Sequence, residues 1–170
     1  MEREHSFRWP DPATTAAAGR RMAGIDFLKA IMDGELPLPA IQAALDFRII
    51  EVGDGRVRFR RQPHEFLYNP LGSVHGAYYA ALLDSALGCA IHSKLKAGAI
   101  YTTLEYKINM VRGLSADSGP VFCEGWVVHP GRRVATSEAR LTDADDRLYA
   151  HGTCSCLILS PDEDAQRRGA

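Results

Sequence analysis

A fifteen-residue run with almost no charge constrains this fold more than any other feature of the sequence. Residues 77–91 read Ala-Tyr-Tyr-Ala-Ala-Leu-Leu-Asp-Ser-Ala-Leu-Gly-Cys-Ala-Ile, in which Asp84 is the only charged side chain. The length and composition of this run favour a helix, and a helix that is apolar all round must be covered on every side. The rest of the chain therefore has to wrap around one central helix.

Asp84 is the candidate catalytic group within this helix. Burying a carboxylate costs several kcal/mol unless it is paired, solvated or kept neutral. Charged residues are rarely buried without a partner, and a buried acid often marks a functional site. We interpret Asp84 as a functional carboxylate.

A turn-rich segment, Asn69-Pro-Leu-Gly-Ser-Val-His75-Gly76, leads into the helix. The first backbone N–H groups of a helix have no partner within it, and that end favours negative charge. A substrate carbonyl oxygen against the Gly76 N–H would be stabilised as charge develops on it. His75 has a simpler interpretation as a helix cap or a satisfied core histidine, and Asn69 has one as a turn former ahead of Pro70.

Asp84 follows Gly76 by eight residues, which is about 12 Å along a helix axis. The two residues of one chain therefore cannot act on the same carbonyl. If they share a site, the carboxylate comes from a second copy that arrives antiparallel across a two-fold axis. On that assumption the spacing predicts a homodimer with two composite sites.

The chain before residue 47 predicts little regular structure besides one helix. Residues 25–32 have helical apolar spacing that ends at Gly34 and the following prolines, and a short helical turn is expected over residues 41–45. Residues 1–22 show no sustained period and are expected to form a flexible arm. The polar residues 161–170 are expected to form a flexible tail.

The remaining segments are typical of strands. Residues 47–52 and 56–60 predict a hairpin around Gly53-Asp-Gly55. Four more strands are expected after the helix, as an antiparallel meander, at residues 100–110, 121–128, 133–141 and 148–159. The fold class is therefore α+β, with five to six strands curling around the helix in one domain over residues 23–160.

Composition excludes several classes of function. Twenty basic against twenty-one acidic side chains give no nucleic-acid surface, and no stretch is long and apolar enough to span a membrane. The N-terminal sequence has no secretory signal, so we expect a cytoplasmic protein. The four cysteines lack zinc-finger spacing, which indicates free thiols and no metal site.

Three motifs together resemble a known family. Residues 69–76 with Asp84 nine residues after the histidine, Tyr101-Thr-Thr-Leu-Glu-Tyr-Lys-Ile-Asn109 and His129-Pro-Gly-Arg-Arg133 are similar to the signature of hotdog-fold acyl-CoA thioesterases of the phenylacetic acid degradation (PaaI-like) type, in the 4-hydroxybenzoyl-CoA thioesterase superfamily. The similarity extends from about residue 24 to residue 159. It implies a hotdog fold with a long central helix and an extra N-terminal helix.

The resemblance also implies roles at the reacting bond. Asp84 would attack the thioester carbon or activate water as a general base, and the Gly76 N–H would hold the oxyanion. Asn69 and His75 would orient the thioester and water. Thr103, rather than Thr102, would position water beside the carboxylate.

Coenzyme A is implied as part of the substrate, with no separate cofactor. The Gly131-Arg132-Arg133 turn, together with Arg112, matches the place where such enzymes bind the phosphates of coenzyme A, although a solvated basic turn explains these arginines equally well. Two departures from the family pattern are Ala77, where a second glycine is common, and Gly113, where a proline is common. The first would narrow the acyl pocket and the second would loosen the strand end beside Arg112.

The expected activity is hydrolysis of acyl-CoA thioesters by a homodimer, assembled further into a homotetramer. Two alternatives remain: a non-catalytic acyl-CoA binding module or sensor, and a hydratase or dehydratase of enoyl thioesters on the same fold. Tyr78, Tyr79 and Leu83 are candidates for the acyl end of the pocket, but aromatic residues on a buried helix are more often core.

Overall fold

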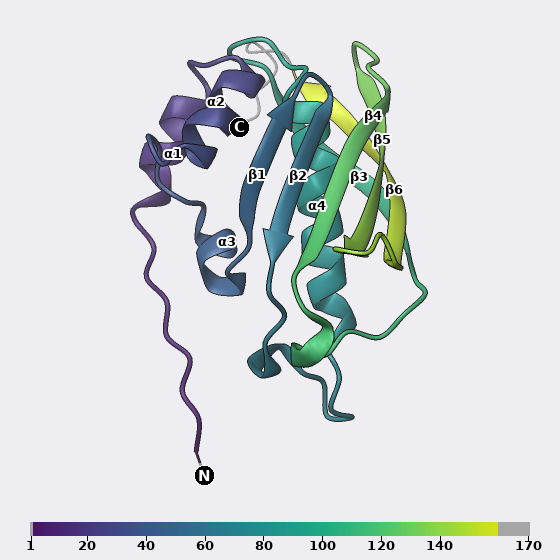
Figure 1. Ribbon diagram of the computed structural model, residues 1–170. Coiled ribbons are helices and arrows are strands. Elements are labelled where there is room, and N and C mark those ends of the chain that lie inside the picture. The colour runs from purple at the N-terminus through teal and green to yellow at the C-terminus, as the bar shows by residue number, and fades with distance from the viewer. Residues whose placement is uncertain (1, 160–170) are drawn as a thin grey trace.

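Helix α4 (Gly76–His92) lies against one face of a six-stranded antiparallel sheet in the computed structural model, which describes residues 2–159 (Figure 1). The strands are β1 (Arg48–Gly53), β2 (Arg56–Arg61), β3 (Ile100–Met110), β4 (Val121–His129), β5 (Val134–Asp143) and β6 (Leu148–Leu159). The predicted α+β class, the central helix and all six strands are confirmed. This is the arrangement expected of a hotdog fold.

The strand order is β1-β2-β4-β5-β6-β3, which corrects one part of the predicted topology. Strands β4, β5 and β6 do form a meander. However, β3 does not pair with β4, which follows it in the chain, but with β6 at the far edge. The connection from β3 to β4 is ten residues long and contains η2 (Ala116–Ser118), so it can pass the two intervening strands, β6 and β5, where a tight hairpin turn could not. Strand β3 therefore becomes an edge strand.

A β-bulge interrupts β3 near its start. Thr103 pairs with Cys156 of β6, but the next pair joins Glu105 to Ser155, so Leu104 has no partner in the ladder. A bulge inserts one residue and reverses the alternation of side chains beyond it. Strand β3 keeps its pairing with β6 on both sides of this point.

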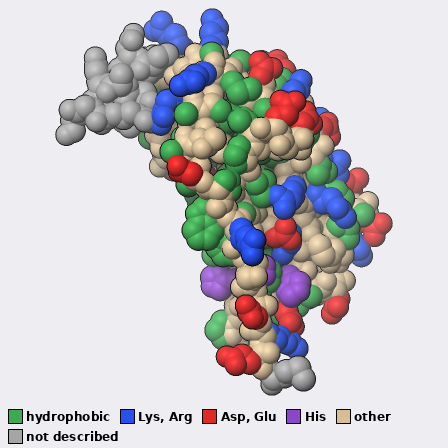
Figure 2. All heavy atoms as spheres, turned by 90° about the vertical axis from the view of Figure 1, so that its left-hand side faces the viewer, with side chains coloured by type: hydrophobic (Ala, Val, Ile, Leu, Met, Phe, Trp, Pro, Cys, Tyr) green, Lys and Arg blue, Asp and Glu red, His purple; other side chains and the backbone are tan. Residues whose placement is uncertain are grey.

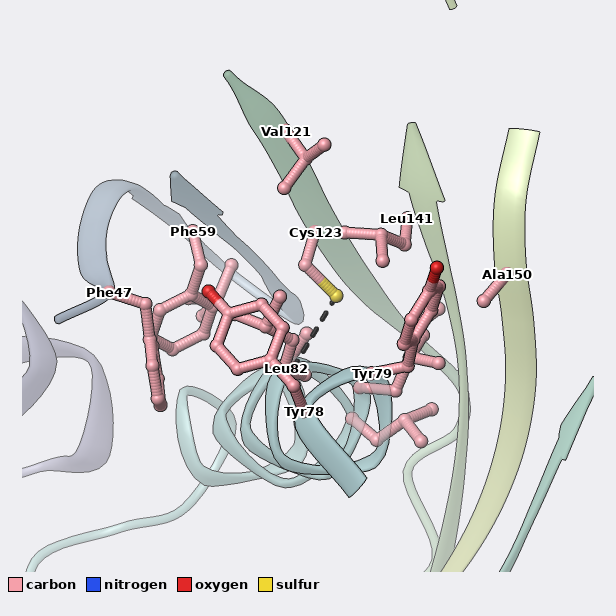
Figure 3. Packing of buried hydrophobic residues seen from close by; sticks show 14 of the residues in the cluster. Phe47, Phe59, Tyr78, Tyr79, Leu82, Val121, Cys123, Leu141 and Ala150 are labelled. Atoms are coloured by element: carbon pink, nitrogen blue, oxygen red, sulfur yellow. Dashed lines mark hydrogen bonds between the residues drawn. The ribbon is translucent and has the colours of Figure 1, made fainter. Parts of the chain in front are cut away.

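Close packing fixes α4 on the sheet. A Cβ at Gly125 of β4 would lie 2.2 Å from the carbonyl oxygen of Ala86, so only glycine allows the helix to approach this strand so closely. Beside it, the Cys123 thiol donates to the carbonyl oxygen of Leu82 at 3.4 Å (Figure 3). The core thus lies between α4 and the sheet, and the helix position is determined by backbone contact.

Three helices precede the sheet: α1 (Pro12–Gly19), α2 (Gly24–Met32) and α3 (Ala40–Leu45). Helix α2 and the short α3 match the predicted helical segments. Helix α1 lies in the stretch expected to be an irregular arm. It is short and has no buried residue, and its prominent signal is the Asp11 cap, whose Oδ1 accepts from the Ala13 N–H at 2.9 Å, followed by Pro12 at its first position.

The segment before α1 runs extended along the side of the molecule (Figure 1). Figure 2 looks onto this side, where histidine side chains gather around the segment. The His5 ring stacks on Phe66 with centroids 3.7 Å apart, and Arg3 forms an ion pair with Glu65. Both partners lie in η1 (Glu65–Leu67), so part of the expected arm has defined contacts.

Three further expectations concern the C-terminal tail, membrane-spanning helices and the cysteines. The predicted tail, residues 161–170, lies outside the described part of the chain. No helix within residues 2–159 is long and apolar enough to cross a membrane. The four cysteines carry free thiols, and the Sγ atoms of Cys154 and Cys156 lie 3.3 Å apart.

His92, the last residue of α4, makes stability sensitive to acid. Both ring nitrogens are buried and have no hydrogen-bond partner within residues 2–159, and burial lowers the pKa of His92 to about 4. In the unfolded chain His92 binds a proton near pH 6.5. The contribution of the neutral, buried His92 to stability is therefore fully present above that pH and is lost as the pH falls toward 4. When the pH is lowered from 7 to 4.5, we expect the free energy of unfolding of His92→Leu to fall by about 2 kcal/mol less than that of the native chain, as measured by urea unfolding. Equal losses in the two proteins would contradict this expectation.

Candidate active site

Asp84 is half-buried on α4 and faces the edge strand β3. The Thr103 hydroxyl donates to its Oδ1 at 3.3 Å, and the same hydroxyl lies 3.9 Å from the Cys156 Sγ. No basic side chain within residues 2–159 forms an ion pair with Asp84. The carboxylate therefore keeps an open oxygen and is held by a neutral donor.

Two ionisable groups near Asp84, Cys89 and Tyr101, are held neutral. Burial raises the pKa of the Cys89 thiol to about 12, and the negative charge of Asp84 adds to this effect. Burial also raises the pKa of Tyr101 well above its ordinary value, with smaller contributions from the Cys89, Cys156 and Asp84 charges. The Asp84 carboxylate is thus better suited than Cys89 or Tyr101 to act as a base or nucleophile.

His75 and Gly76 begin α4 as predicted. The His75 Nδ1 accepts from the Ala77 N–H at 3.0 Å, so this imidazole caps the helix, which is the simpler of the two interpretations. The backbone N–H of His75 in turn donates to the Leu67 carbonyl at 2.8 Å. The Gly76 N–H has no acceptor among the described residues. It is an available donor at the positive end of the helix.

Asn69 organises the turn that leads to this helix start. Its Oδ1 accepts from the N–H groups of Leu71, at 2.9 Å, and Ser73, at 3.3 Å, and its Nδ2 donates to the Ser73 hydroxyl at 3.0 Å. This is an Asx turn, in agreement with the turn-former interpretation. One Nδ2 hydrogen remains for another acceptor.

Asp84 and Gly76 do not meet within one chain. Both lie on α4, so their separation stays near 12 Å along the helix axis. Each, however, is associated with β3: Asp84 with Thr103 near its start, and Gly76 with Met110 at its end, where a Cβ on Gly76 would lie 3.1 Å from the Met110 Sδ. The two halves of the candidate site thus lie at opposite ends of the same edge strand.

A pocket of about 890 Å³ lies at the other end of α4. It contains the predicted Gly131, Arg132 and Arg133, which form the hairpin between β4 and β5. It also contains Lys94 and Lys96 from the connection between α4 and β3, which were not predicted as site residues from the sequence. Their only sequence signal is two lysines directly after the apolar helix.

The geometry of this hairpin explains why position 131 is a glycine. A Cβ there would lie 1.9 Å from the carbonyl oxygen of Val134 and 2.9 Å from the His129 Nε2. Glycine is therefore required for the tight turn that presents Arg132 and Arg133 to the pocket.

Arg112 is not part of this pocket. Its Nε donates to the Leu148 carbonyl at 3.4 Å and its guanidinium lies 5.8 Å from the Tyr149 ring centroid, at the start of β6. The Arg133 carbonyl instead accepts from the Ile158 N–H near the end of β6. These positions are about 30 Å apart along an extended strand. One chain therefore does not bring the two arginines together.

Tyr78, Tyr79 and Leu83 are all buried, and none lines the pocket. Figure 3 shows Tyr78 pointing toward Phe47, which directly precedes β1, and toward Phe59 of β2. Within a single chain these three residues belong to the core. Among the described residues, no three His, Cys, Asp or Glu side chains gather to hold a metal ion.

Comparison with known proteins agrees with this fold. The sequence model of the thioesterase superfamily matches residues 71–150, which include Gly76, Asp84 and Thr103. A 1,4-dihydroxy-2-naphthoyl-CoA hydrolase of Listeria monocytogenes is 21% identical over 118 residues, covering 69% of this chain and 94% of the relative.

Two solved structures are similar over nearly their whole length. A conserved protein of Pseudomonas aeruginosa is 32% identical with a TM-score of 0.67, and the match covers 72% of this chain and 95% of that one. A phenylacetic acid degradation-related protein of Ralstonia eutropha is 26% identical with a TM-score of 0.69, covering 76% and 98% respectively.

Proposed function

Because the chain belongs to the thioesterase superfamily, we propose that it hydrolyses acyl-CoA thioesters to a free acid and coenzyme A at a site shared by two copies of the chain. The observation that carries this proposal is the half-buried Asp84, held by a hydroxyl of an edge strand and free of any ion pair within residues 2–159. The Listeria relative is a 1,4-dihydroxy-2-naphthoyl-CoA hydrolase, which supports the choice of substrate class.

The shared site follows from the open edge of β3. Leu104, Tyr106 and Met110 are 57%, 45% and 50% exposed on this strand, and an edge strand has backbone groups ready to pair with a second copy. Two β3 strands that pair antiparallel about a two-fold axis place the Thr103 end of one beside the Met110 end of the other. Asp84 of one copy then faces Gly76 of the other.

The same pairing would bring Arg112 close to the other copy's basic pocket. Arg112 follows Met110 by two residues, so it lies beside the start of the other copy's β3. That strand start follows the connection that lines the basic pocket. Arg112 can thus contribute to phosphate binding across the interface although one chain separates it from Arg133.

Two chemical routes fit this site. As a general base, Asp84 takes a proton from water, the hydroxide attacks the thioester carbon, and the proton passes to the departing coenzyme A thiolate. As a nucleophile, its carboxylate attacks the same carbon, coenzyme A leaves as the thiolate, and water cleaves the resulting anhydride. In both routes the Gly76 N–H stabilises the oxyanion. Turnover in ¹⁸O-water separates them where water attacks the aspartyl carbon, because label in Asp84 requires the anhydride.

Asn69 and His75 support this reaction by positioning. The Asx turn and the helix cap fix the backbone that aims the Gly76 N–H, and the remaining Nδ2 hydrogen of Asn69 is placed on the same turn. Their role is to orient the thioester and the attacking water.

Complementation between two inactive variants tests the shared site. Asp84→Ala and Gly76→Pro chains should each be nearly inactive alone, with at most about 1% of native kcat. A mixed dimer has one site carrying both lesions and one native site. A statistical 1:1 mixture should recover about a quarter of the native activity. Hydrolysis is followed by trapping the released thiol over a panel of acyl-CoAs.

The outcomes of this assay separate the alternatives. Tight acyl-CoA binding without turnover by the native protein would favour a sensor, and loss of enoyl absorbance with crotonyl-CoA would favour a hydratase. Turnover of native protein without recovery in the mixture would contradict the shared site.

Thr103→Val should lower kcat about tenfold, because a hydrogen bond to a charged group contributes about 1.5 kcal/mol or more. Thr103→Ser keeps the hydroxyl and is the matched control, with kcat expected close to native. Native kcat in Thr103→Val, which keeps the methyl group and lacks the hydroxyl, would show that the hydroxyl of Thr103 does not contribute.

A further inference from the structure

The basic pocket at the end of α4 has the chemistry of a polyphosphate site. Four of its lining residues are cationic, and none is acidic. Its remaining walls include the apolar Ile91, Val127 and Ile158. A ligand with several negative charges beside an uncharged surface fits this composition.

The charges in this pocket are largely uncompensated. Lys96, Arg132 and Arg133 are exposed and form no ion pair within residues 2–159. Lys94 pairs with the exposed Asp54 at 2.7 Å. At least three free positive charges thus converge on one pocket and favour an anion there.

The geometry of α4 relates this pocket to one half of the catalytic site. Ile91, in the pocket wall, lies seven residues after Asp84, about 10 Å along the helix axis. Gly76 of the same chain lies fifteen residues before Ile91, about 22 Å away in the same direction. The pocket is therefore closer to its own chain's carboxylate than to its own chain's oxyanion donor.

We infer that the phosphates of the substrate's coenzyme A bind in the pocket of the same chain that supplies Asp84, with Lys94 and Lys96 as binding residues beside Arg132 and Arg133. The second copy supplies the Gly76 N–H. This inference rests on the proposed function and specifies which parts of the shared site come from which copy.

Binding of free coenzyme A tests the lysines without any turnover. In calorimetry at low salt, Lys96→Ala should raise the Kd about tenfold, and Lys94→Ala should raise it by a smaller factor because Asp54 competes for that ammonium. Lys29→Ala, which removes an exposed charge outside the pocket, is the matched control and should leave the Kd unchanged. A Kd unchanged by Lys96→Ala would overturn the assignment of that lysine.

A mixed dimer tests the arrangement. One copy carries Asp84→Asn, and the other carries the pocket variant Lys96→Ala with Arg133→Ala; the two copies are tagged differently so that the mixed species can be purified. The single remaining Asp84 then lies on the copy with the altered pocket. Our inference predicts that this mixed dimer shows the same raised KM as a dimer of the pocket variant, with about half of that dimer's kcat.

A native KM in this mixed dimer would overturn the inference, because the pocket of the Asp84→Asn copy would then serve the other copy's carboxylate. A dimer of Asp84→Asn with the native chain is the reference and should show native KM at half of the native kcat. Failure of the proposed function would look different, since the native protein would then hydrolyse no acyl-CoA.

Discussion

Asp84→Asn is expected to lower kcat by at least about 10³-fold, within the range of a lost general base or nucleophile. Asparagine has nearly the same shape and its Oδ1 can still accept from Thr103, so the contact between α4 and β3 is kept. What is lost is the ability to take a proton or to attack a carbonyl carbon. The measurement is kcat with the best acyl-CoA of the panel, beside an unfolding curve for each protein.

Ser85→Ala provides the control for Asp84→Asn. The Ser85 hydroxyl donates to the Ala81 carbonyl at 2.7 Å within the helix, so this substitution changes a polar group next to Asp84 without touching the carboxylate. We expect native kcat within about twofold, since a half-buried hydrogen bond from a serine to its own helix contributes little. If Asp84→Asn kept more than a tenth of the native kcat, the carboxylate would not be the catalytic group.

Gly76→Pro is expected to lower kcat by about 10²-fold to 10³-fold, the effect of removing one oxyanion donor. Proline lacks the N–H, yet it is favoured at the first position of a helix, which is where Gly76 lies. His75 already has the extended backbone, φ −64° and ψ 139°, that a following proline requires. The variant therefore removes the donor while keeping the helix start.

Gly76→Ala is the matched control for the proline variant. Its Cβ meets the same neighbour, the flexible Met110 side chain, which has to move by a few tenths of an ångström, but its N–H is kept. We expect a modest loss in kcat for alanine and a large one for proline. Equal losses would assign the effect to crowding by Met110 rather than to the missing donor.

The sequence predicted the parts of the fold that depend on local patterns. The apolar run over residues 77–91, with Asp84 as its only charge, indicated a covered helix. Strict alternation over residues 56–60 and the turn clusters between the later segments indicated the strands. The neighbour of β3 could not be read in the same way, because strand pairing is decided by long-range contacts that leave no periodic signal. The order of hairpins along the chain favoured β4 as its neighbour, and the structure places β6 there.

The candidate site was predictable to a similar extent. A lone acid in an apolar helix and a glycine at its start could both be recognised from sequence. The lysines of the pocket could not, because Lys94 and Lys96 belong to it only through the folding of a distant hairpin against the end of α4. For the same reason Arg112 and Arg133 resembled one binding set in the sequence but lie at opposite ends of β6.

The unpaired residue of β3 decides on which face the later side chains of that strand lie. Thr103 and Met110 are seven positions apart, and in an uninterrupted strand an odd separation would turn one of them away from α4. Their partners on β6, Cys156 and Ala150, are six apart and both buried, so both ends of β3 face the helix only because Leu104 is left over. Deleting Leu104 would turn the side chains of β3 on one side of this position to the opposite face of the strand. Either Asp84 or Gly76 would then lie against side chains that now face solvent.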